Sequence, residues 1–590
     1  MNFKRLFCLL AASYAALPLL VPTTLASSKA AEYTNDAIGR MPSPVVVSDP
    51  VAYYHSRQLA LKLVQAERWN EAVPVLQRLT SQYADDGDTW YLMGLSYLAT
   101  RNWRDAIEAL ENTLGLGTAL QGIPTGSAPS NDIMVNIALA HAQLGEDVQA
   151  LAWLESALAA RWDERHSLIG HTGFSSLQDS EAFRRVSGSA ISDLESVAAW
   201  DQDLSFLVES IERLHVDMYH AISREGFEAE VASLRLQLPT LTDRQIMVEF
   251  MRLLGSLGNG HNFIVPIYSK KGSLLKLPMQ FYWFSDGLFV VAADDEYEEL
   301  IGNKVELIGA TPAAEAASAT KQVNARDNEM QHLLLSPYYL ALPAVLENLD
   351  IVENESVVSL TLTTPAGERV TVQPTPREFD FSGFPALPPP PDVPAPPYLT
   401  QVSKAYWSQT FPDSNTLYIQ FNNVTNLEEQ SLKQFNHAVR QEITAQSVDT
   451  LILDLRQNSG GNGSILPPML RTLIYFETTY PSGQLFVIMG RKTFSAGHEL
   501  LAQISQLTNA VLVGEPSGSR PNALSESGWF VLPYSGIRGI VSSQFHQPSS
   551  PEDHRIWIAP HVPVSLSSKA YFEGRDPALE SILNITAKQQ

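Results

Sequence analysis

The spacing of hydrophobic positions changes three times along the chain. Apolar residues recur at helical spacing over residues 54–160 and again over residues 204–257, where Asp243 opens an amphipathic run. Short β-rich runs separated by turns then fill residues 277–374. The last part of the chain alternates strand-like and helical segments, in the order 417–421, 427–446, 450–455, 485–489 and 496–507. Such alternation predicts a largely parallel sheet with crossover helices.

These changes predict an α/β protein of several domains, because single cores rarely grow beyond about 250–300 residues. Proline lacks the amide donor and fixes its backbone angle, so the proline run at 385–397 is expected to be a linker or surface arm. Within the β-rich region, residues 302–310 resemble a strand of a PDZ-like module, with an ordinary strand pair as the alternative. The expected segments are a signal peptide (1–30), helical repeats (50–190), a helical subdomain (197–270), a β-rich middle region (271–376), a proline-rich linker (383–398) and an α/β domain (399–590).

The first helical region is similar to tetratricopeptide repeats, in which paired helices recur about every 34 residues. The matching positions are Trp90, Gly94, Tyr97, Trp103, Ala106 and Leu110. Residues 66–76 mirror residues 99–110, and a third unit at 136–158 follows an insertion rich in glycine, proline and serine. Such a stack either offers a groove to a peptide or partner protein, or forms a packed helical cap without a ligand.

The N-terminus has the layout of a secretory signal. Lys4 and Arg5 precede an almost uninterrupted apolar run over residues 6–21, and cleavage is expected after Ala26 or Ala30. The run is short for a membrane-spanning helix, which needs about 20 apolar residues, so an uncleaved anchor is the lesser alternative and no stable membrane span is expected after cleavage. The only cysteine, Cys8, lies inside this segment. We therefore predict an exported protein, periplasmic or secreted, without disulfides or a cysteine nucleophile.

Charge narrows the range of partners. The chain carries 64 acidic and 40 basic residues, a net charge of −24, and such a surface repels phosphate backbones. Nucleic acid is therefore excluded as a partner. No cysteine pair or histidine spacing indicates a zinc site, and no cofactor is predicted.

Three glycine-marked turns follow predicted strands, and ligand sites of open α/β sheets assemble at such strand ends. They span residues 454–463, 490–499 and 514–522. In the first, Gly460 and Gly461 allow backbone amides to face a developing negative charge. In the second, Ser495 begins a helix, where the amide of Ala496 is a further donor. Taken alone, Ser495 is more often a helix cap than a nucleophile.

Together, these turns resemble the signature of the peptidase family that includes the tail-specific (C-terminal-processing) proteases and tricorn. The matching elements are Asp454-Leu455-Arg456-Asn458-Gly460-Gly461, Ser495-Ala496 and Gly514-Glu515-Pro516, followed by Leu532-Pro533, Ser535-Gly536, Ile558-Ala559-Pro560 and Arg575-Asp576-Pro577-Ala578-Leu579. The resemblance covers about residues 204–583. It implies a crotonase-like or ClpP-like catalytic domain, a peptide or protein substrate, and Ser495 as the nucleophile of a serine peptidase.

The resemblance also bears on the general base. Tail-specific members use a lysine, but the aligned position here holds Arg520, which stays protonated and cannot accept the proton of a serine. Tricorn-like members use a histidine, and His261 lies in a segment (LGNGHNF) that resembles their glycine-aspartate-glycine-histidine-threonine turn. Imidazole suits the role because its pKa is near 6.5. Asn259 and Asn262 replace the usual aspartate and threonine.

An orienting carboxylate must come from elsewhere, and the resemblance suggests Asp553, with Glu515 and Glu526 as rivals. Amides of Gly460 or Gly461, with that of Ala496, would form the oxyanion hole. Three functions remain open. The first is an exported serine peptidase whose repeats recruit substrate or a partner protein. The second is a catalytically silent scaffold that binds peptides, partner proteins or hydrophobic ligands, and the third is an esterase with the same acyl chemistry.

Overall fold

The computed structural model describes residues 41–120, 130–189, 194–265, 269–381, 386–411, 414–446 and 448–588. The predicted signal segment and the start of the proline-rich linker lie outside the described residues. The chain divides into two compact units, with Met1–Leu214 and Gly528–Arg538 in unit 1 and His215–Ser527 and Gly539–Gln590 in unit 2. Within the described ranges, no helix is both long and apolar enough to cross a membrane.

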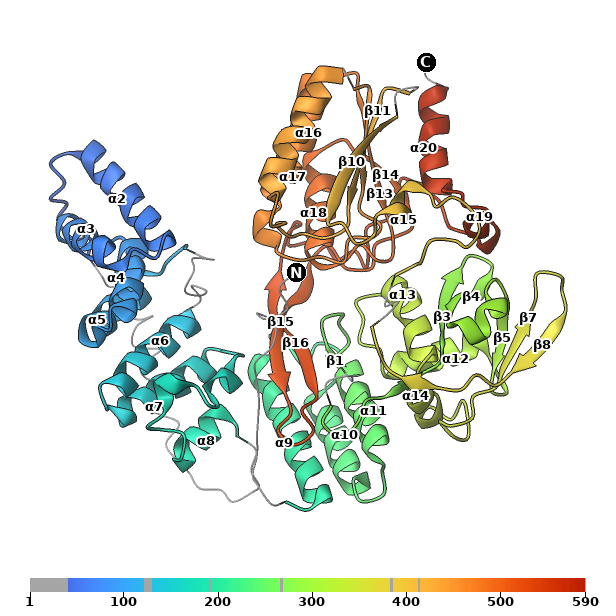
Figure 1. Cartoon of the computed structure of the whole chain (residues 1–590), viewed down its shortest axis with the longest axis horizontal. Helices are drawn as coiled ribbons and strands as arrows, with labels where there is room; N and C mark the ends of the chain where they lie inside the picture. Colours follow the sequence, from blue (N-terminus) through green and yellow to red (C-terminus); the bar gives the residue numbers. More distant parts are fainter. Residues whose placement is uncertain are drawn as a thin grey trace. The chain divides into compact units, whose positions relative to one another are not determined.

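Unit 1 contains a stack of helix pairs in which each helix from α2 to α7 packs against the next along the chain (Figure 1). The pairs are α2 (Pro50–Gln65) with α3 (Trp69–Gln82), α4 (Gly87–Ala99) with α5 (Trp103–Leu116), and α6 (Ser130–Gln143) with α7 (Asp147–Ala159), followed by α8 (Glu181–Ser187) and α9 (Ser196–Leu214). Gly94 permits the close approach of α4 and α5, since a Cβ there would lie 2.6 Å from Leu110 Cδ2. Three helix pairs were predicted from the sequence, and three are present.

Unit 2 begins with helices that lead to the predicted base. Helix α10 spans Arg224–Gln237 and α11 spans Asp243–Gly255. A capping box between Thr242 and Gln245 starts α11, because each side chain bonds the other residue's backbone amide. After α11 the chain turns through Asn259, Gly260 and His261 into β1 (Phe263–Val265).

The β-rich middle region is a complete antiparallel sheet rather than an isolated strand pair. Its order is β3-β4-β5-β7-β8, with β6 paired to β5. The strands are β3 (Met279–Phe284), β4 (Gly287–Ala293), β5 (Lys304–Ile308), β6 (Thr311–Pro312), β7 (Leu360–Thr363) and β8 (Arg369–Val372), and β2 (Leu275–Lys276) pairs separately with β9 (Arg377–Glu378). The helices are α12 (Ala313–Ala319), α13 (Glu329–Leu340) and α14 (Pro343–Asn348). Residues 386–396 form neither helix nor strand, as the prolines predict.

The C-terminal part is the predicted α/β sheet, in the order β10-β11-β12-β13-β14-β17. Strand β10 runs antiparallel to β11, and the other pairs are parallel. The strands are β10 (Tyr406–Phe411), β11 (Thr416–Phe421), β12 (Thr450–Asp454), β13 (Gln484–Met489), β14 (Val511–Gly514) and β17 (Val562–Pro563). The helices are α15 (Pro397–Thr400), α16 (Leu432–Gln446), α17 (Pro467–Thr479), α18 (Ser495–Leu507), α19 (Ser568–Phe572) and α20 (Pro577–Ala587).

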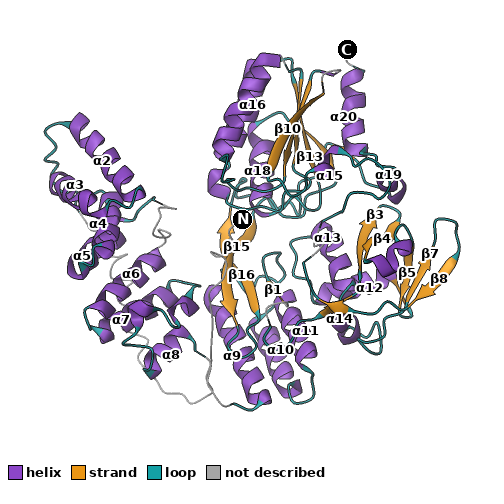
Figure 2. Ribbon diagram, viewed as in Figure 1, coloured by secondary structure: helices purple, strands orange, loops and turns teal. Residues whose placement is uncertain are grey.

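Helices cover both faces of this sheet (Figure 2). Side chains alternate between faces along each strand, so Leu451 and Leu453 pack in the core with α16–α18, whereas Ile452 packs with Ile582 of α20. Burial on both faces explains why these strands read as continuous apolar runs. A hairpin of β15 (Ala523–Val531) and β16 (Arg538–His546) joins β1 in a separate sheet, in the order β1-β16-β15.

Candidate active site

Ser495 is the first residue of α18, directly after the loop that leaves β13. Its φ of +50° lies in the left-handed region, which a non-glycine residue adopts only at a cost. The loop is fixed from both sides, because Thr493 Oγ1 donates to the Leu455 carbonyl (2.9 Å) and the Phe494 amide donates to the Asn458 carbonyl (3.0 Å). Strained residues held in this way collect at functional sites.

His261 meets this serine. Its Nε2 lies 3.2 Å from Ser495 Oγ and 3.2 Å from Ser525 Oγ, and its ring stacks on Phe494 with centroids 4.5 Å apart. Burial, together with the charge of His546, lowers the pKa of His261 to about 3. The imidazole is therefore neutral at pH 7, the form that can accept a proton from a hydroxyl.

The turn that carries His261 is held by residues of the middle region. Asp327 Oδ1 accepts from the Gly260 amide (2.9 Å), and Asp327 Oδ2 accepts from Ser519 Oγ. Gln331 Nε2 donates to the Gly260 carbonyl (3.4 Å), and a Cβ on Gly260 would lie 2.4 Å from Gln331 Oε1. Burial raises the pKa of Asp327. This support could not be predicted from the sequence, because Asp327 and Gln331 lie more than sixty residues after His261 along the chain.

Arg520 stands close to the same support. Its Nε donates to the backbone carbonyl of Asp327 (3.1 Å). At the position where the sequence resemblance would place a lysine, a guanidinium therefore bonds the segment that holds the histidine turn.

Asn259 and Asn262 also serve this turn. The Asn259 amide nitrogen donates to the Leu524 carbonyl (3.3 Å) and to Ser542 Oγ, while Asn262 Oδ1 accepts from the Ser542 amide (3.0 Å). His215 Nε2 lies 3.1 Å from Asn259 Oδ1. A carboxylate could not donate as Asn259 does. The two departures from the family pattern therefore tie the histidine turn to β15 and β16.

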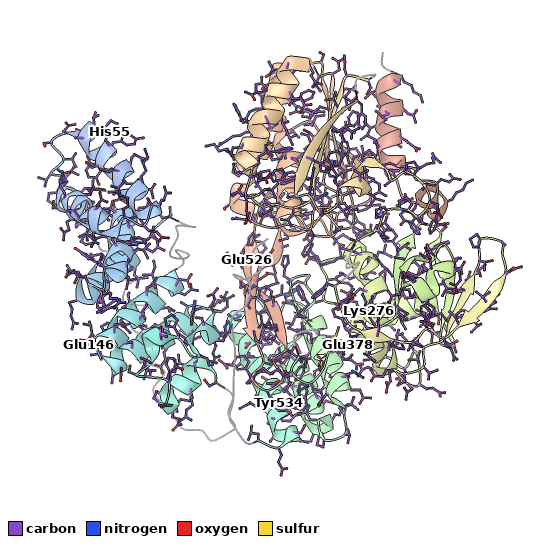
Figure 3. The ribbon with its side chains drawn as sticks, viewed as in Figure 1. His55, Glu146, Lys276, Glu378, Glu526 and Tyr534 are labelled. Atoms are coloured by element: carbon purple, nitrogen blue, oxygen red, sulfur yellow. The ribbon has the colours of Figure 1, made fainter. Side chains whose placement is uncertain are left out.

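None of the three expected carboxylates contacts His261. Asp553 binds Arg555 Nε (2.9 Å) and Ser549, and the pairing with Arg555 holds the pKa of Asp553 well below its usual range. Glu515 accepts two hydrogen bonds, of 2.8 and 2.6 Å, from Arg491. Glu526 lies on β15 (Figure 3) with its Oε2 3.7 Å from His546 Nε2. The buried Nδ1 of His261 has no hydrogen-bond partner among the described residues.

The amides expected to form an oxyanion hole differ in their availability. The Gly460 amide donates to Asn458 Oδ1 (2.9 Å), so it is already engaged. Within the described part of the chain, the amides of Gly461 and Ala496 make no hydrogen bond. Gly460 instead supplies space, because a Cβ on it would lie 2.6 Å from Ser495 Cβ and 3.1 Å from the Ala496 nitrogen. The donor pair that remains is Gly461 and Ala496.

A pair of ionisable groups, Glu499 on the serine helix and His546 beside it, was not expected from the sequence. Glu499 follows Ser495 by one helical turn, and its Oε1 bonds His546 Nδ1 at the end of β16. The hydrogen bond to Glu499 raises the pKa of His546. The only sequence signal was the i, i+4 spacing of Ser495 and Glu499, which places both on one helix face.

The lowered pKa of His261 predicts a pH-dependent stability. In the unfolded chain His261 has a pKa near 6.5 and is protonated below that pH, whereas in the folded protein it stays neutral down to about pH 3. Stability is therefore fully present above pH 6.5 and falls as the pH drops from 6.5 towards 3. Between pH 7 and pH 5 we expect the wild type to lose about 2 kcal/mol more unfolding free energy than His261→Gln, measured by chemical denaturation. Equal losses in the two proteins would contradict a buried, neutral imidazole.

Among the described residues, no cluster of three or more histidine, cysteine, aspartate or glutamate side chains could hold a metal ion. The site residues that the structure brings together are Ser495, His261, Ser525, Gly460, Gly461 and Ala496, all within unit 2. In this arrangement the neutral imidazole of His261 lies within hydrogen-bond distance of the Ser495 hydroxyl, and the amides of Gly461 and Ala496, unbonded within the described residues, belong to the two segments that meet at this serine.

Comparison with known proteins gives matches of two kinds. Residues 91–165 match the family model of the tetratricopeptide repeat, which confirms the repeat prediction for that segment. No curated protein matches the chain. Among solved structures, the chain is similar to mature CPAF complexed with lactacystin, with 11% identity and a TM-score of 0.48 over 66% of this chain and 98% of that one.

Two further solved structures are similar to the chain. The photosystem II D1 C-terminal processing protease has 14% identity and a TM-score of 0.32, over 67% of this chain and 98% of that one. The tricorn protease has 13% identity and a TM-score of 0.31, over 67% of this chain and 37% of that one. These structures include both kinds of peptidase that the sequence motifs resemble. At these identities and TM-scores the likeness adds nothing to the residue roles, which rest on the geometry of this chain.

Proposed function

We propose that unit 2 is a serine hydrolase that acts on peptide bonds through an acyl-enzyme on Ser495, with His261 as the general base. The observation that carries this proposal is the 3.2 Å contact between His261 Nε2 and the strained Ser495 hydroxyl. A neutral imidazole in hydrogen-bond reach of a serine is the basic requirement for activating it. The choice of a peptide as substrate rests on the resemblance of the three glycine-marked turns to the peptidase family.

The reaction would run in two halves. Ser495 Oγ attacks the substrate carbonyl carbon while its proton passes to His261 Nε2, and the amides of Gly461 and Ala496 stabilise the resulting oxyanion. The carbon–nitrogen bond then breaks, and His261 returns the proton to the leaving amine. In the second half, water gives a proton to His261 and attacks the ester, and Ser495 leaves with that proton. The steps need no group beyond the chain, the substrate and water.

Two further parts of the proposal concern the whole chain. The signal-like segment at 1–30 would direct export to the periplasm or the exterior, and the helical repeats of unit 1 would recruit a peptide, a protein substrate or a partner protein. Repeat stacks commonly present extended binding surfaces, and residues 91–165 match such a repeat.

A catalytically silent scaffold is the second candidate, and one observation favours it. His261 Nδ1 has no acceptor among the described residues, and Ser525 shares Nε2 with Ser495. An imidazolium formed at this position would lack the carboxylate that stabilises it in serine triads. The same fold would then bind peptides without cutting them.

Labelling with a fluorophosphonate probe tests the proposal. We expect the folded wild type to be labelled at Ser495, Ser495→Ala to be unlabelled, and Ser505→Ala to label as the wild type does. Ser505 is a matched control because it lies on the same helix and its hydroxyl bonds, among the described residues, only the Ala502 carbonyl (2.8 Å). Mass spectrometry of the labelled peptide identifies the serine. No labelling of folded wild type would favour the silent scaffold, and labelling with hydrolysis of p-nitrophenyl esters but of no quenched peptide would favour an esterase.

A further inference from the structure

Lys492 is a half-buried cation for which the described residues supply no carboxylate. Its Nζ donates to the neutral Gln457 Oε1 (3.2 Å), and it forms no ion pair among the described residues. Burial lowers its pKa to about 8, so the ammonium form still predominates at pH 7. A partly desolvated ammonium without a partner gains more from an approaching anion than one that is fully solvated.

Lys492 lines a pocket at the carboxyl ends of β12, β13 and β14, the edge where ligands bind in open α/β sheets. Its walls include Lys492, Gln457 and Gly490, and on the apolar side Tyr282, Leu334 and Leu387. The pocket has a volume of about 80 Å³, several times the roughly 10–15 Å³ that holds one water on this measure. A carboxylate with one or two attached carbons fits such a space.

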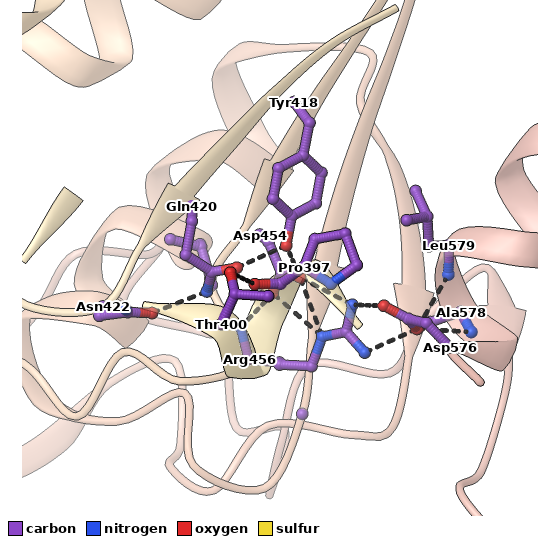
Figure 4. A network of polar contacts seen from close by, with 12 residues as sticks. Pro397, Thr400, Tyr418, Gln420, Asn422, Asp454, Arg456, Asp576, Ala578 and Leu579 are labelled. Carbon is purple, nitrogen blue, oxygen red and sulfur yellow. Dashed lines mark hydrogen bonds and ion pairs between the residues drawn. The ribbon is translucent and has the colours of Figure 1, made fainter. Parts of the chain in front are cut away.

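The other charges that line this pocket are already matched. Arg456 lies between Asp454 and Asp576, with both ion pairs at 2.7 Å (Figure 4). The surplus negative charge of this triad is stabilised by hydrogen bonds, because Tyr418 Oη donates to Asp454 Oδ2 (2.7 Å) and the amide of Ala578 donates to Asp576 Oδ1 (3.2 Å).

Arg491, the third cation of the pocket, is paired with Glu515, whose two oxygens accept at 2.8 and 2.6 Å. Of the three cations that line the pocket, only Lys492 therefore lacks an acid within the described residues. Gln457 adds a second donor, because its Nε2 makes no hydrogen bond to any described residue.

The pocket is tied to the reacting serine through the chain. Lys492 precedes Ser495 by three residues, and Gln457 precedes Gly460 by three residues. Three residues span at most about 11 Å. A group held by Lys492 and Gln457 would therefore belong to a substrate residue within a few positions of the bond that is cut.

We propose that Lys492 and Gln457 form a specificity subsite that binds a carboxylate of the peptide substrate. One carboxylate oxygen would accept from Lys492 Nζ and the other from Gln457 Nε2, with Tyr282 and Leu334 covering the attached carbons. The carboxylate belongs either to an aspartate or glutamate side chain or to the C-terminus of the peptide. This subsite rests on the function proposed above for Ser495.

Equilibrium binding to the Ser495→Ala protein tests the subsite without requiring turnover. The probes are fluorescent heptapeptides in which one glutamate is moved through the central positions, their glutamine twins, and versions of each with a free or amidated C-terminus, measured by anisotropy. We expect at least one carboxylate peptide to bind roughly 10-fold or more tightly than its neutral twin, the usual range for a hydrogen bond to a charged group. The glutamine and amide twins distinguish the side chain from the C-terminus.

Lys492→Gln and Lys492→Met should abolish the preference and leave binding of the neutral twin unchanged. Lys404→Gln is the matched control, because it removes the same charge from an exposed position of unit 2 and should keep the preference. Lys492→Met should unfold at the same or a higher denaturant concentration than its parent, since it removes a half-buried charge that has no acidic partner among the described residues. A preference that survives both Lys492 variants, equal weakening of both twins, or no binding by any peptide would overturn the subsite. Fluorophosphonate labelling of the wild type reports separately on the Ser495 chemistry.

Discussion

Replacing His261 by alanine is expected to slow fluorophosphonate labelling of Ser495 by about 10²–10⁴-fold, the usual contribution of a general base. The reason is geometric, since Nε2 at 3.2 Å is the only side-chain nitrogen recorded in hydrogen-bond distance of Ser495 Oγ among the described residues. The measurement is the second-order labelling rate of variant and wild type at pH 7, with circular dichroism to show that both are folded. The backbone donors at Gly461 and Ala496 remain in the variant, so a residual rate is expected.

His437→Ala is the control for this experiment. His437 is exposed on α16, and its removal should leave the labelling rate unchanged. If His261→Ala labelled at the wild-type rate while Ser495→Ala did not label, Ser495 would be reactive without this imidazole, and the base role of His261 would be wrong. A slow wild type that His261→Ala does not slow further would point to the silent scaffold.

The strands of the C-terminal sheet and the helices that cover it could be predicted because each follows a regular pattern of buried apolar residues. Each central strand is covered on both faces, so its apolar run marks it directly, and β11, β12 and β13 begin within one residue of the predicted positions. Helix α16 begins at Leu432, five residues after its predicted start. Helix α18 begins at Ser495, where the strand-to-helix turn was expected. Local patterns were sufficient wherever local burial decides the structure.

The side chains that surround the candidate active site could not be predicted from such local patterns in the sequence. Ser525 reaches His261 because β15 and β16 fold as a long hairpin, and the sequence motifs at 532–533 and 535–536 lie in the turn of this hairpin. Asp553 was expected from its position relative to a family pattern. A carboxylate's partners depend on the loop that carries it, and here Arg555, two residues away, binds Asp553 locally.

Asp327 and the two asparagines, Asn259 and Asn262, hold the backbone of the turn that carries His261. The backbone on either side of His261 is fixed by hydrogen bonds to Gly260 and through Asn259 and Asn262, but the His261 ring itself has no partner on Nδ1 within the described residues. Its orientation comes instead from stacking on Phe494, one residue before Ser495. The position of the His261 ring is therefore set by its packing on Phe494 and by the hydrogen bonds of the neighbouring backbone, rather than by a carboxylate bound to the imidazole.

Gly460→Ala is expected to lower the unfolding free energy of unit 2 by about 2–5 kcal/mol and to abolish labelling of Ser495. Two costs add. The φ of Gly460 is +108°, which strains any residue with a Cβ, and the added Cβ would lie 2.6 Å from Ser495 Cβ. Either the 456–461 loop or the serine turn must shift, and a shift of about 1 Å at a reacting group can cost 10²-fold in rate.

Gly367→Ala separates these two costs. Its φ of +85° imposes a similar backbone strain, but no atom lies within 4 Å of the added Cβ. We expect this control to lose about 1 kcal/mol and to label at the wild-type rate. Denaturant unfolding and labelling of both variants together distinguish strain from collision. If Gly460→Ala were no less stable than Gly367→Ala and labelled normally, Gly460 would not pack against Ser495, and the close approach of the two loops on which the oxyanion hole depends would be wrong.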